Sequence, residues 1–215
     1  MELKPYKTFL APAEEEFIVN KSRFIGAGTP AETEEEALAF LAKRRAMHPG
    51  SNHCCYAYII GPNMGIMRYS DDGEPGGTAG LPIIEAMKAR GVTNCCVVVT
   101  RYFGGILLGA GGLVRAYSKG SACAINACGV GIMWPTTRMI LEVSYPMLGK
   151  FEHFLADKPI RVEEKSFTDS ITFTILARTK DVELFTRQTV EISNGAIEPI
   201  PMEEEFMAWP EEDDA

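Results

Sequence analysis

The sequence lacks several features that would place it in a familiar class. None of its apolar runs approaches the ~20 residues of a membrane-spanning helix. Its first residues also lack the basic-then-apolar pattern of a secretory signal. It contains no Cys-x-x-Cys motif, and its three histidines have no metal-ligand spacing. We therefore expect a cytoplasmic protein with no membrane partner, no bound metal and no cofactor.

The cysteines are arranged in a way that argues against disulfide or metal chemistry. Two adjacent pairs, Cys54–Cys55 and Cys95–Cys96, lie in apolar runs typical of strands. Because neighbouring side chains of a strand point to opposite faces, neither pair can hold one metal ion. Cys123 and Cys128 lie five residues apart in a segment of small residues. The pattern favours reduced, buried, structural cysteines over a redox or metal role.

Charge is divided unevenly along the chain. Residues 1–135 contain 13 Lys and Arg against 12 Asp and Glu, whereas residues 136–215 contain 8 against 17. An acidic second half repels nucleic-acid backbones, so any contact with RNA is expected from the first half, and no DNA partner is expected. The last residues, from 204 onward, read as a frayed acidic tail.

Hydrophobic periodicity predicts alternating strands and helices in the first half. Thr33 and Glu36 have the spacing of a helix capping box, and Gly91 is a plausible helix C-cap. The cations at 43–45 close the first helix, where they complement the helix dipole; a partner-binding patch is the open alternative. The predicted strands span 24–28, 54–60, 66–69 and 95–100, and the predicted helices span 33–45, 80–90 and 109–127.

The second half predicts a separate fold. Strands are expected at 139–144, 160–167, 171–177 and 195–200, with helices at 146–156 and 181–190. This β-α-β-β-α-β order is that of a ferredoxin-like unit. The fold class is therefore α+β, with domains at 1–135 and 136–203 and an acidic tail at 204–215.

A glycine-rich acidic stretch, "SDDGEPGGTAG", occupies residues 70–80. Gly73 suits a turn that needs a positive φ, and Pro75 fixes the direction of the chain. Thr78 is placed to cap the following helix. Turn geometry thus explains the glycines, the proline and the threonine, but not the acidic residues between them.

The acidic side chains of this stretch are Asp71, Asp72 and Glu74. Adjacent carboxylates repel each other unless a cation compensates them. Pairing with a basic group such as Arg101 or Arg115 is the favoured interpretation. A divalent metal or a catalytic carboxylate stays open, because hard cations bind clustered carboxylates.

A second glycine-rich loop follows the buried strand "CCVVVT". Arg101 precedes two aromatic residues and then Gly104 and Gly105, which allow a close backbone approach. Arginine beside aromatic rings suits phosphate or base recognition. Alternatively, the aromatics fill the core and Arg101 pairs with an acid. Residues 109–112 form a weak phosphate-loop candidate, since they lack the Walker ending and depart from GxGxxG.

Both loops join a strand to a helix, and such loops gather at one edge of a sheet. His53 begins a strand and could face the same edge, although a structural role is favoured for a lone histidine. We therefore expect the two loops to converge and to bring the aspartates beside a guanidinium.

Several stretches of the sequence resemble segments of a known family. The stretches "SDDGEPGGTAG", "RYFGG" and "GGLVRAYSKG" are similar to hallmark segments of the Impact/YigZ (UPF0029) family, bacterial two-domain type, over roughly residues 16–130. The resemblance implies an N-terminal domain like the second domain of ribosomal protein S5. It also implies a C-terminal ferredoxin-like domain, and the pair is similar to the fourth and fifth domains of elongation factor G.

The resemblance also implies a site, without giving its ligand. The family's shared positions fall here on His53, Asp71, Asp72, Gly73, Glu74, Thr78, Arg101, Gly104, Gly105 and Arg115.

Three functions are compatible with these observations. The favoured one is a translation-associated binding protein whose first domain contacts RNA, the ribosome or a translation factor through Arg101, Arg115 and Lys119. The alternative is an enzyme acting on a nucleotide or phosphorylated small molecule, with residues 104–112 holding phosphate and the carboxylates of residues 71–74 serving as metal ligands or base. The third is a protein-interaction module that uses the ferredoxin-like sheet.

Overall fold

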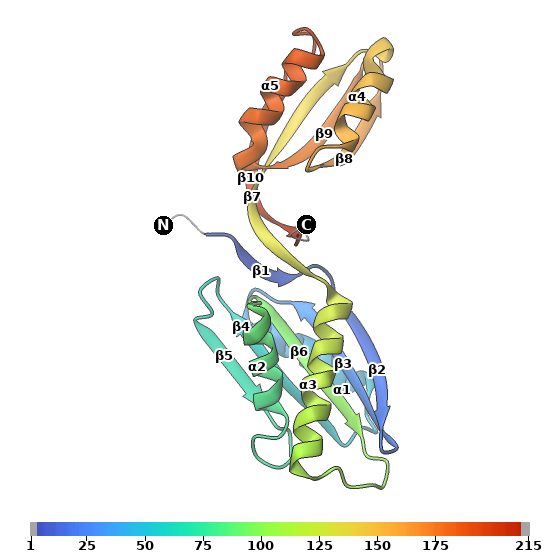
Figure 1. Cartoon of the computed structure of the whole chain (residues 1–215), viewed down its shortest axis with the longest axis vertical. Coiled ribbons are helices and arrows are strands. Elements are labelled where there is room, and N and C mark those ends of the chain that lie inside the picture. The colour runs from blue at the N-terminus through green and yellow to red at the C-terminus, as the bar shows by residue number, and fades with distance from the viewer. Residues whose placement is uncertain (1–3, 212–215) are drawn as a thin grey trace. The chain divides into compact units, whose positions relative to one another are not determined.

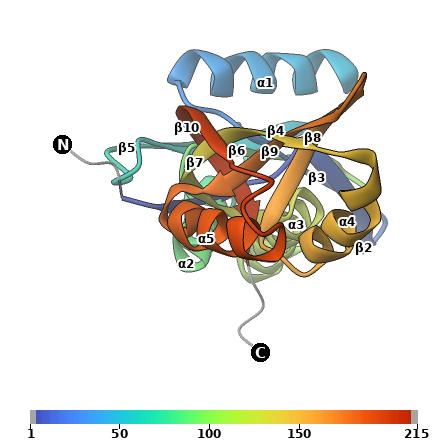
Figure 2. The same cartoon turned by 90° about the horizontal axis from the view of Figure 1, so that it is seen from above.

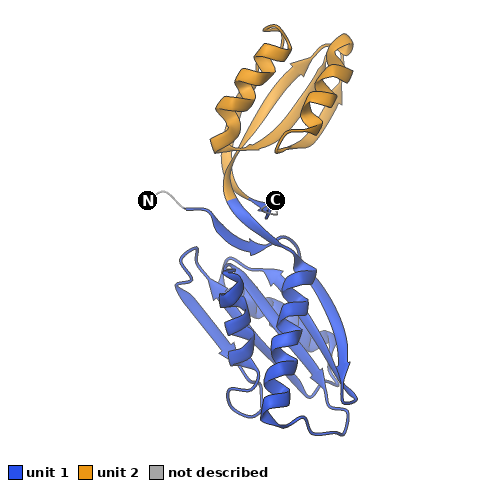
Figure 3. Cartoon of the chain, viewed as in Figure 1, with its two compact units in different colours: residues 1–133, 208–215 blue, residues 134–207 orange. Residues whose placement is uncertain are grey.

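The computed structural model describes residues 4–211, which form two compact units (Figure 3). Unit 1 contains residues 1–133 together with 208–215, and unit 2 contains residues 134–207. Both units combine helices with antiparallel strands, which confirms the predicted α+β class. No helix within residues 4–211 combines the length and apolarity needed to cross a bilayer.

Unit 1 is built on one five-stranded antiparallel sheet. Its strands lie in the order β2 (Ala13–Val19), β3 (Ser22–Pro30), β6 (Cys95–Tyr102), β4 (His53–Ile60) and β5 (Ile66–Ser70). Helix α1 (Glu34–Met47) covers one face, and α2 (Gly80–Arg90) and α3 (Gly109–Cys128) cover the other (Figures 1 and 2). Outside this sheet, β1 (Tyr6–Phe9) pairs with the first residues of β7 (Val130–Val143).

The sheet of unit 1 has a hydrophobic core on each face. Cys55 and Cys95 pack in the core under α2 and α3, whereas Cys54 and Cys96 pack in the core under α1. The members of each adjacent pair therefore point to opposite faces, as predicted. All six cysteines are free thiols.

Glycines allow α3 to lie directly on the sheet. A Cβ atom added at Gly26 of β3 would come within 2.0 Å of the Gly120 carbonyl oxygen on α3. Only hydrogen fits at Gly26, so the prediction of a small-residue helix packed closely on a sheet is confirmed.

Unit 2 has the predicted ferredoxin-like β-α-β-β-α-β order. After β7 it contains the short helix η1 (Tyr145–Met147), α4 (Leu148–Ala156), β8 (Ile160–Phe167), β9 (Ile171–Arg178), the short helix η2 (Thr179–Asp181), α5 (Val182–Ile192) and β10 (Ile200–Pro210). Its strands lie in the order β10-β7-β9-β8. Phe151 and Leu155 of α4 and Phe185 of α5 pack on Met139 and Leu141 of β7 in its core.

The last strand differs from the prediction. Residues 195–199 connect α5 to β10, and the strand spans residues 200–210, so the expectation of a frayed tail from residue 204 is wrong up to Pro210. Its acidic side chains have partners, since Glu203 and Glu205 both pair with Arg138 of β7. Residues 212–215 of the predicted tail lie outside the described residues.

Candidate functional site

The two glycine-rich loops meet at one end of unit 1. The first connects β5 to α2, and the second connects β6 to α3. Arg101, near the end of β6, donates from Nη1 to Oε1 of Glu74 at 2.6 Å. Both side chains are almost fully buried, with 5% of Arg101 and 8% of Glu74 exposed. The predicted convergence of the two loops is therefore confirmed, but the carboxylate that meets the Arg101 guanidinium is Glu74 and not, as predicted, an aspartate.

Further groups surround this ion pair. The hydroxyl of Tyr117 on α3 donates to the same Glu74 oxygen at 2.7 Å. Burial, followed by the nearby Cys55 and then Glu74, raises the pKa of Tyr117 far above its ordinary value. The guanidinium of Arg101 lies 5.4 Å from the ring centres of both Phe24 and Phe103. A buried ion pair often adds little to stability, so stability alone does not account for this one. Charged clusters of this kind are frequent at functional sites, and we therefore treat this cluster as a candidate site.

Asp71 caps helix α2. Its Oδ1 accepts from the backbone N–H groups of Ala79 and Gly80 at 3.0 and 2.8 Å, and its Oδ2 accepts from Gly77 at 2.9 Å. Burial alone would raise the pKa of Asp71, but the three backbone donors outweigh it, and the pKa is lowered. Its carboxylate is thus committed to the positive end of a helix.

Asp72 has different partners, which relieves its repulsion with Asp71. Its Oδ2 accepts from the backbone N–H of Cys54 at 2.7 Å, and its Oδ1 accepts from Nη2 of Arg45 at 2.8 Å. Arg45, at the end of α1, was expected to complement a helix dipole or to belong to a partner-binding patch. Sequence reasoning missed it as a partner because it lies 27 residues away.

His53, at the start of β4, also lies in this cluster. Its Nδ1 lies 2.8 Å from the backbone carbonyl oxygen of Asp72. A carbonyl can only accept, so Nδ1 carries the proton, and in the neutral ring Nε2 carries a lone pair. This Nε2 lies 3.9 Å from Oε1 of Glu74. The sequence hint that His53 faces the same edge is therefore confirmed.

Two of the predicted site residues, Thr78 and Gly104, make contacts within the fold. The hydroxyl of Thr78 donates to the carbonyl of Pro75 at 2.6 Å, so the predicted role of Thr78 as the helix cap is wrong and Asp71 takes that role. A Cβ at Gly104 would come within 2.0 Å of the backbone of Lys21, so Gly104 packs against the turn between β2 and β3. Gly105 has a φ of +83°, a conformation that favours glycine.

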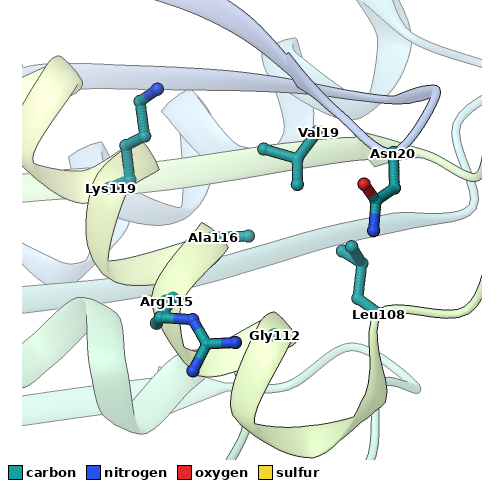
Figure 4. Close-up of a pocket in the computed structure, with 7 residues that line it drawn as sticks. All are labelled: Val19, Asn20, Leu108, Gly112, Arg115, Ala116 and Lys119. Carbon is teal, nitrogen blue, oxygen red and sulfur yellow. The ribbon is translucent and has the colours of Figure 1, made fainter.

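Two neighbouring pockets open beside these loops. The first, here called the Arg101 pocket, has a volume of about 410 Å³ and is lined by His53, Glu74, Arg101, Phe103, Leu107 and Leu113, among others. The second, here called the Arg115 pocket, has a volume of about 210 Å³ and is lined by Val19, Asn20, Leu108, Gly112, Arg115, Ala116 and Lys119 (Figure 4). Leu108 lines both, so the pockets adjoin each other.

The predicted residues therefore form two groups. His53, Glu74 and Arg101 line the first pocket, and Arg115 and Lys119 line the second. Within residues 4–211, no three His, Cys, Asp or Glu side chains are placed to hold a metal ion. Tyr117 was missed, although a tyrosine within the small-residue segment "GGLVRAYSKG" is a signal that could have found it.

Comparison with known proteins supports a family assignment. A family model described as the Impact N-terminal domain matches residues 20–125, and a domain of unknown function (DUF1949) matches residues 141–196. The IMPACT family member YvyE of Bacillus subtilis is 39% identical over 193 residues, covering 90% of this chain and 89% of that protein. The chain belongs to the IMPACT family.

Other relatives of this IMPACT family member extend over the same two domains. The IMPACT family member YigZ of Escherichia coli is 32% identical over 86% of this chain and 92% of its own length. A crystal structure described as that of a hypothetical protein is 32% identical, with a TM-score of 0.60, and covers 95% of this chain and 100% of its own. None of these names specifies a ligand, so the role of the site rests on its geometry.

Proposed function

We propose that this IMPACT family member is an RNA-binding protein of the translation apparatus, and that unit 1 holds RNA phosphates at the Arg115 pocket. The observation that carries the proposal is the lining of that pocket. Arg115 and Lys119 lie one turn apart on α3 and line it together with Asn20, and no acidic side chain lines it. Paired cations without a neighbouring carboxylate suit the phosphates of a nucleic-acid backbone.

The beginning of α3 adds to this positive potential. The helix starts at Gly109, has no acidic residue in its first turn, and has no side-chain cap. The first N–H groups of a helix lack partners within the helix, and its N-terminal end carries a partial positive charge. Residues 109–112, considered above as a phosphate loop, form this first turn. They therefore support anion binding through the helix rather than through a loop.

Arg101 has no place among the phosphate contacts. It was expected to touch RNA, but it is buried and pairs with Glu74. A guanidinium neutralised in this way does not exchange its partner for a phosphate without leaving the carboxylate unpaired. Phosphate contact is therefore assigned to Arg115 and Lys119. The link to translation rests on the resemblance of the two domains to ribosomal protein S5 and elongation factor G.

The alternative of a nucleotide-dependent enzyme has less support. That alternative needs carboxylate oxygens for magnesium or for a base. Both oxygens of Asp71 accept from backbone N–H groups, and both oxygens of Asp72 have donors. A metal would have to displace these donors, including those that cap α2.

Protein docking on the ferredoxin-like sheet also has less support. An apolar open face would favour it, whereas Arg138 of β7 forms ion pairs there with Glu163, Glu203 and Glu205. A network of exposed charges is typical of a solvated face.

Titration of RNA binding against salt tests the proposal. The anisotropy of an end-labelled single-stranded RNA is measured with the whole protein at several KCl concentrations. We expect Arg115→Ala and Lys119→Ala each to weaken binding and to reduce the slope of log K against log salt by about 0.7, the value for one phosphate contact on a single strand. Lys43→Ala is the matched control, since it removes one exposed charge from α1 on the opposite face of the sheet. The absence of salt-dependent binding, or equal slopes for all variants, would contradict the proposal.

A further inference from the structure

The Arg101 pocket is lined both by exposed apolar side chains and by a buried charged group. Phe103 and Leu107 line this pocket with 44% and 85% of their surfaces exposed, so two large apolar side chains face water beside it. Phe103 contacts the buried guanidinium of Arg101, which holds the ring beside the pocket. Exposed aromatic rings in nucleic-acid-binding proteins serve as platforms on which bases stack. The volume of about 410 Å³ lies within the range of about 300–1,000 Å³ typical of small-molecule sites.

The polar groups of the pocket are incompletely paired. Oε1 of Glu74 already accepts from Arg101 and Tyr117, whereas Nε2 of His53, 3.9 Å away, is in the neutral imidazole an acceptor to which no described residue donates. Nε of Arg101 is a buried donor with no acceptor among residues 4–211. Buried polar atoms without partners are rare in native proteins and call for an explanation. A ligand amino group would supply the donor that Nε2 of His53 lacks, and its second N–H would face the Glu74 carboxylate.

We propose that the Arg101 pocket receives one unpaired base of the bound RNA, and that it favours a base with an exocyclic amino group. This inference rests on the proposed function, because the phosphates of the same strand would lie at the adjoining Arg115 pocket. Adenine, cytosine and guanine each carry an amino donor next to an acceptor on one edge. Uracil has no amino group, and its one edge donor, N3–H, lies between two carbonyl oxygens. When N3–H donates to His53, one of these oxygens would therefore face the Glu74 carboxylate.

The inference makes a specific demand on the nucleic acid. A base inside a duplex is stacked and paired, so it cannot enter a pocket without being extruded. Single strands, loops and bulges offer such a base at little cost. The phosphate contacts of Arg115 and Lys119 make no such demand, since duplex and single strand both carry phosphates. The part of this discrimination that is lost in Phe103→Leu therefore reports on the Arg101 pocket.

The experiment uses the whole protein and a short RNA with one 2-aminopurine, a fluorescent base that carries an exocyclic amino group and is quenched when it stacks. The strand is tested alone and annealed to its complement. We expect quenching and tighter binding with the single strand, and tighter binding of oligo(A) and oligo(C) than of oligo(U). Phe103→Leu should lose the quenching and weaken binding by about 5- to 150-fold, the range for one base–aromatic stack. Phe103→Tyr, which keeps a ring, should retain both.

Leu38→Ala is the control for loss of an exposed apolar side chain, since Leu38 lies on α1 on the opposite face of the sheet. Equal affinity for duplex and single strand, quenching that survives Phe103→Leu, or equal affinity for oligo(U) would overturn the inference. If Arg115→Ala and Lys119→Ala still reduce the salt slope in that case, the proposed function stands without it. If the protein binds neither form of RNA, both fail.

Discussion

The buried ion pair between Glu74 and Arg101 leads to a prediction about the stability of unit 1. Arg101→Met leaves the Glu74 carboxylate, whose side chain is 3% exposed, with Tyr117 as its remaining hydrogen-bond donor. Removing one partner of a buried pair costs about 3–5 kcal/mol, because the other charge stays desolvated. We expect this loss in the free energy of unfolding for Arg101→Met, and a similar loss for Glu74→Leu, which leaves the guanidinium unpaired.

The double variant should be more stable than either single variant. With both charges gone, the main group that has lost a partner is the hydroxyl of Tyr117, and loss of a buried hydrogen bond of this kind costs about 1–3 kcal/mol. The two substitutions are therefore strongly coupled, as expected for residues in direct contact.

Urea unfolding followed by tryptophan fluorescence measures these differences. The chain has two tryptophans, and Trp209, which is 6% exposed, belongs to unit 1, whereas Trp134 belongs to unit 2. In a Trp134→Phe background the signal therefore reports on unit 1. With an m-value of about 2 kcal/mol per molar urea, the single variants should unfold at about 1.5–2.5 M less urea and the double variant at about 0.5–1.5 M less. A double variant whose loss equals the sum of the single losses would refute the reasoning.

Three further predictions concern other parts of unit 1. The pKa of Asp71 is lowered in the folded protein, so its contribution is fully present above the ordinary carboxyl pKa of about 4 and is lost as the pH falls through the lower folded value. Asp71→Asn should cost about 1–3 kcal/mol at neutral pH and flatten the acid limb of a stability–pH curve measured by urea unfolding. Gly104→Ala should lower the melting temperature by several degrees, because its Cβ would meet the backbone of Lys21, whereas Gly76→Ala, with nothing within 4 Å, should leave it unchanged; equal melting temperatures would contradict the close packing. Alkylation of the native protein should modify Cys123 first, since it is the one cysteine that is not buried; intact-mass spectra showing several early adducts would count against the described burial.

Local sequence signals predicted the regular elements well. Helix α2 begins and ends where periodicity placed it, and Gly91 has the left-handed conformation expected of its C-cap. Thr33 accepts from the backbone N–H of Glu36, as the capping-box spacing indicated. These features depend on residues within one or two turns of each other. Such interactions can be seen in the sequence because no distant partner is needed to produce them.

The features that escaped prediction depend on distant partners. Strand β2 carries three consecutive glutamates and lies at the edge of its sheet, where charged residues are tolerated, so its sequence does not alternate as a half-buried strand would. The acidic part of strand β10 was read as a tail because the partner of its glutamates, Arg138 on β7, is more than 60 residues away. The acidic loop was recognised as unusual, but the sequence could not say that Asp71 caps a helix while Asp72 binds Arg45.

The last described residues of the chain complete unit 1. Glu211 pairs with Lys7 and with Arg90, and its backbone N–H donates to the carbonyl of Val130. Expression of residues 1–133 alone would thus omit part of the folded body and leave these cations without their acid. A cleaner dissection would excise residues 134–207 and join the cut ends with a short glycine linker. The ferredoxin-like unit is thus enclosed in the sequence by two segments of the same folded body, and a truncation at either end of the chain would damage unit 1.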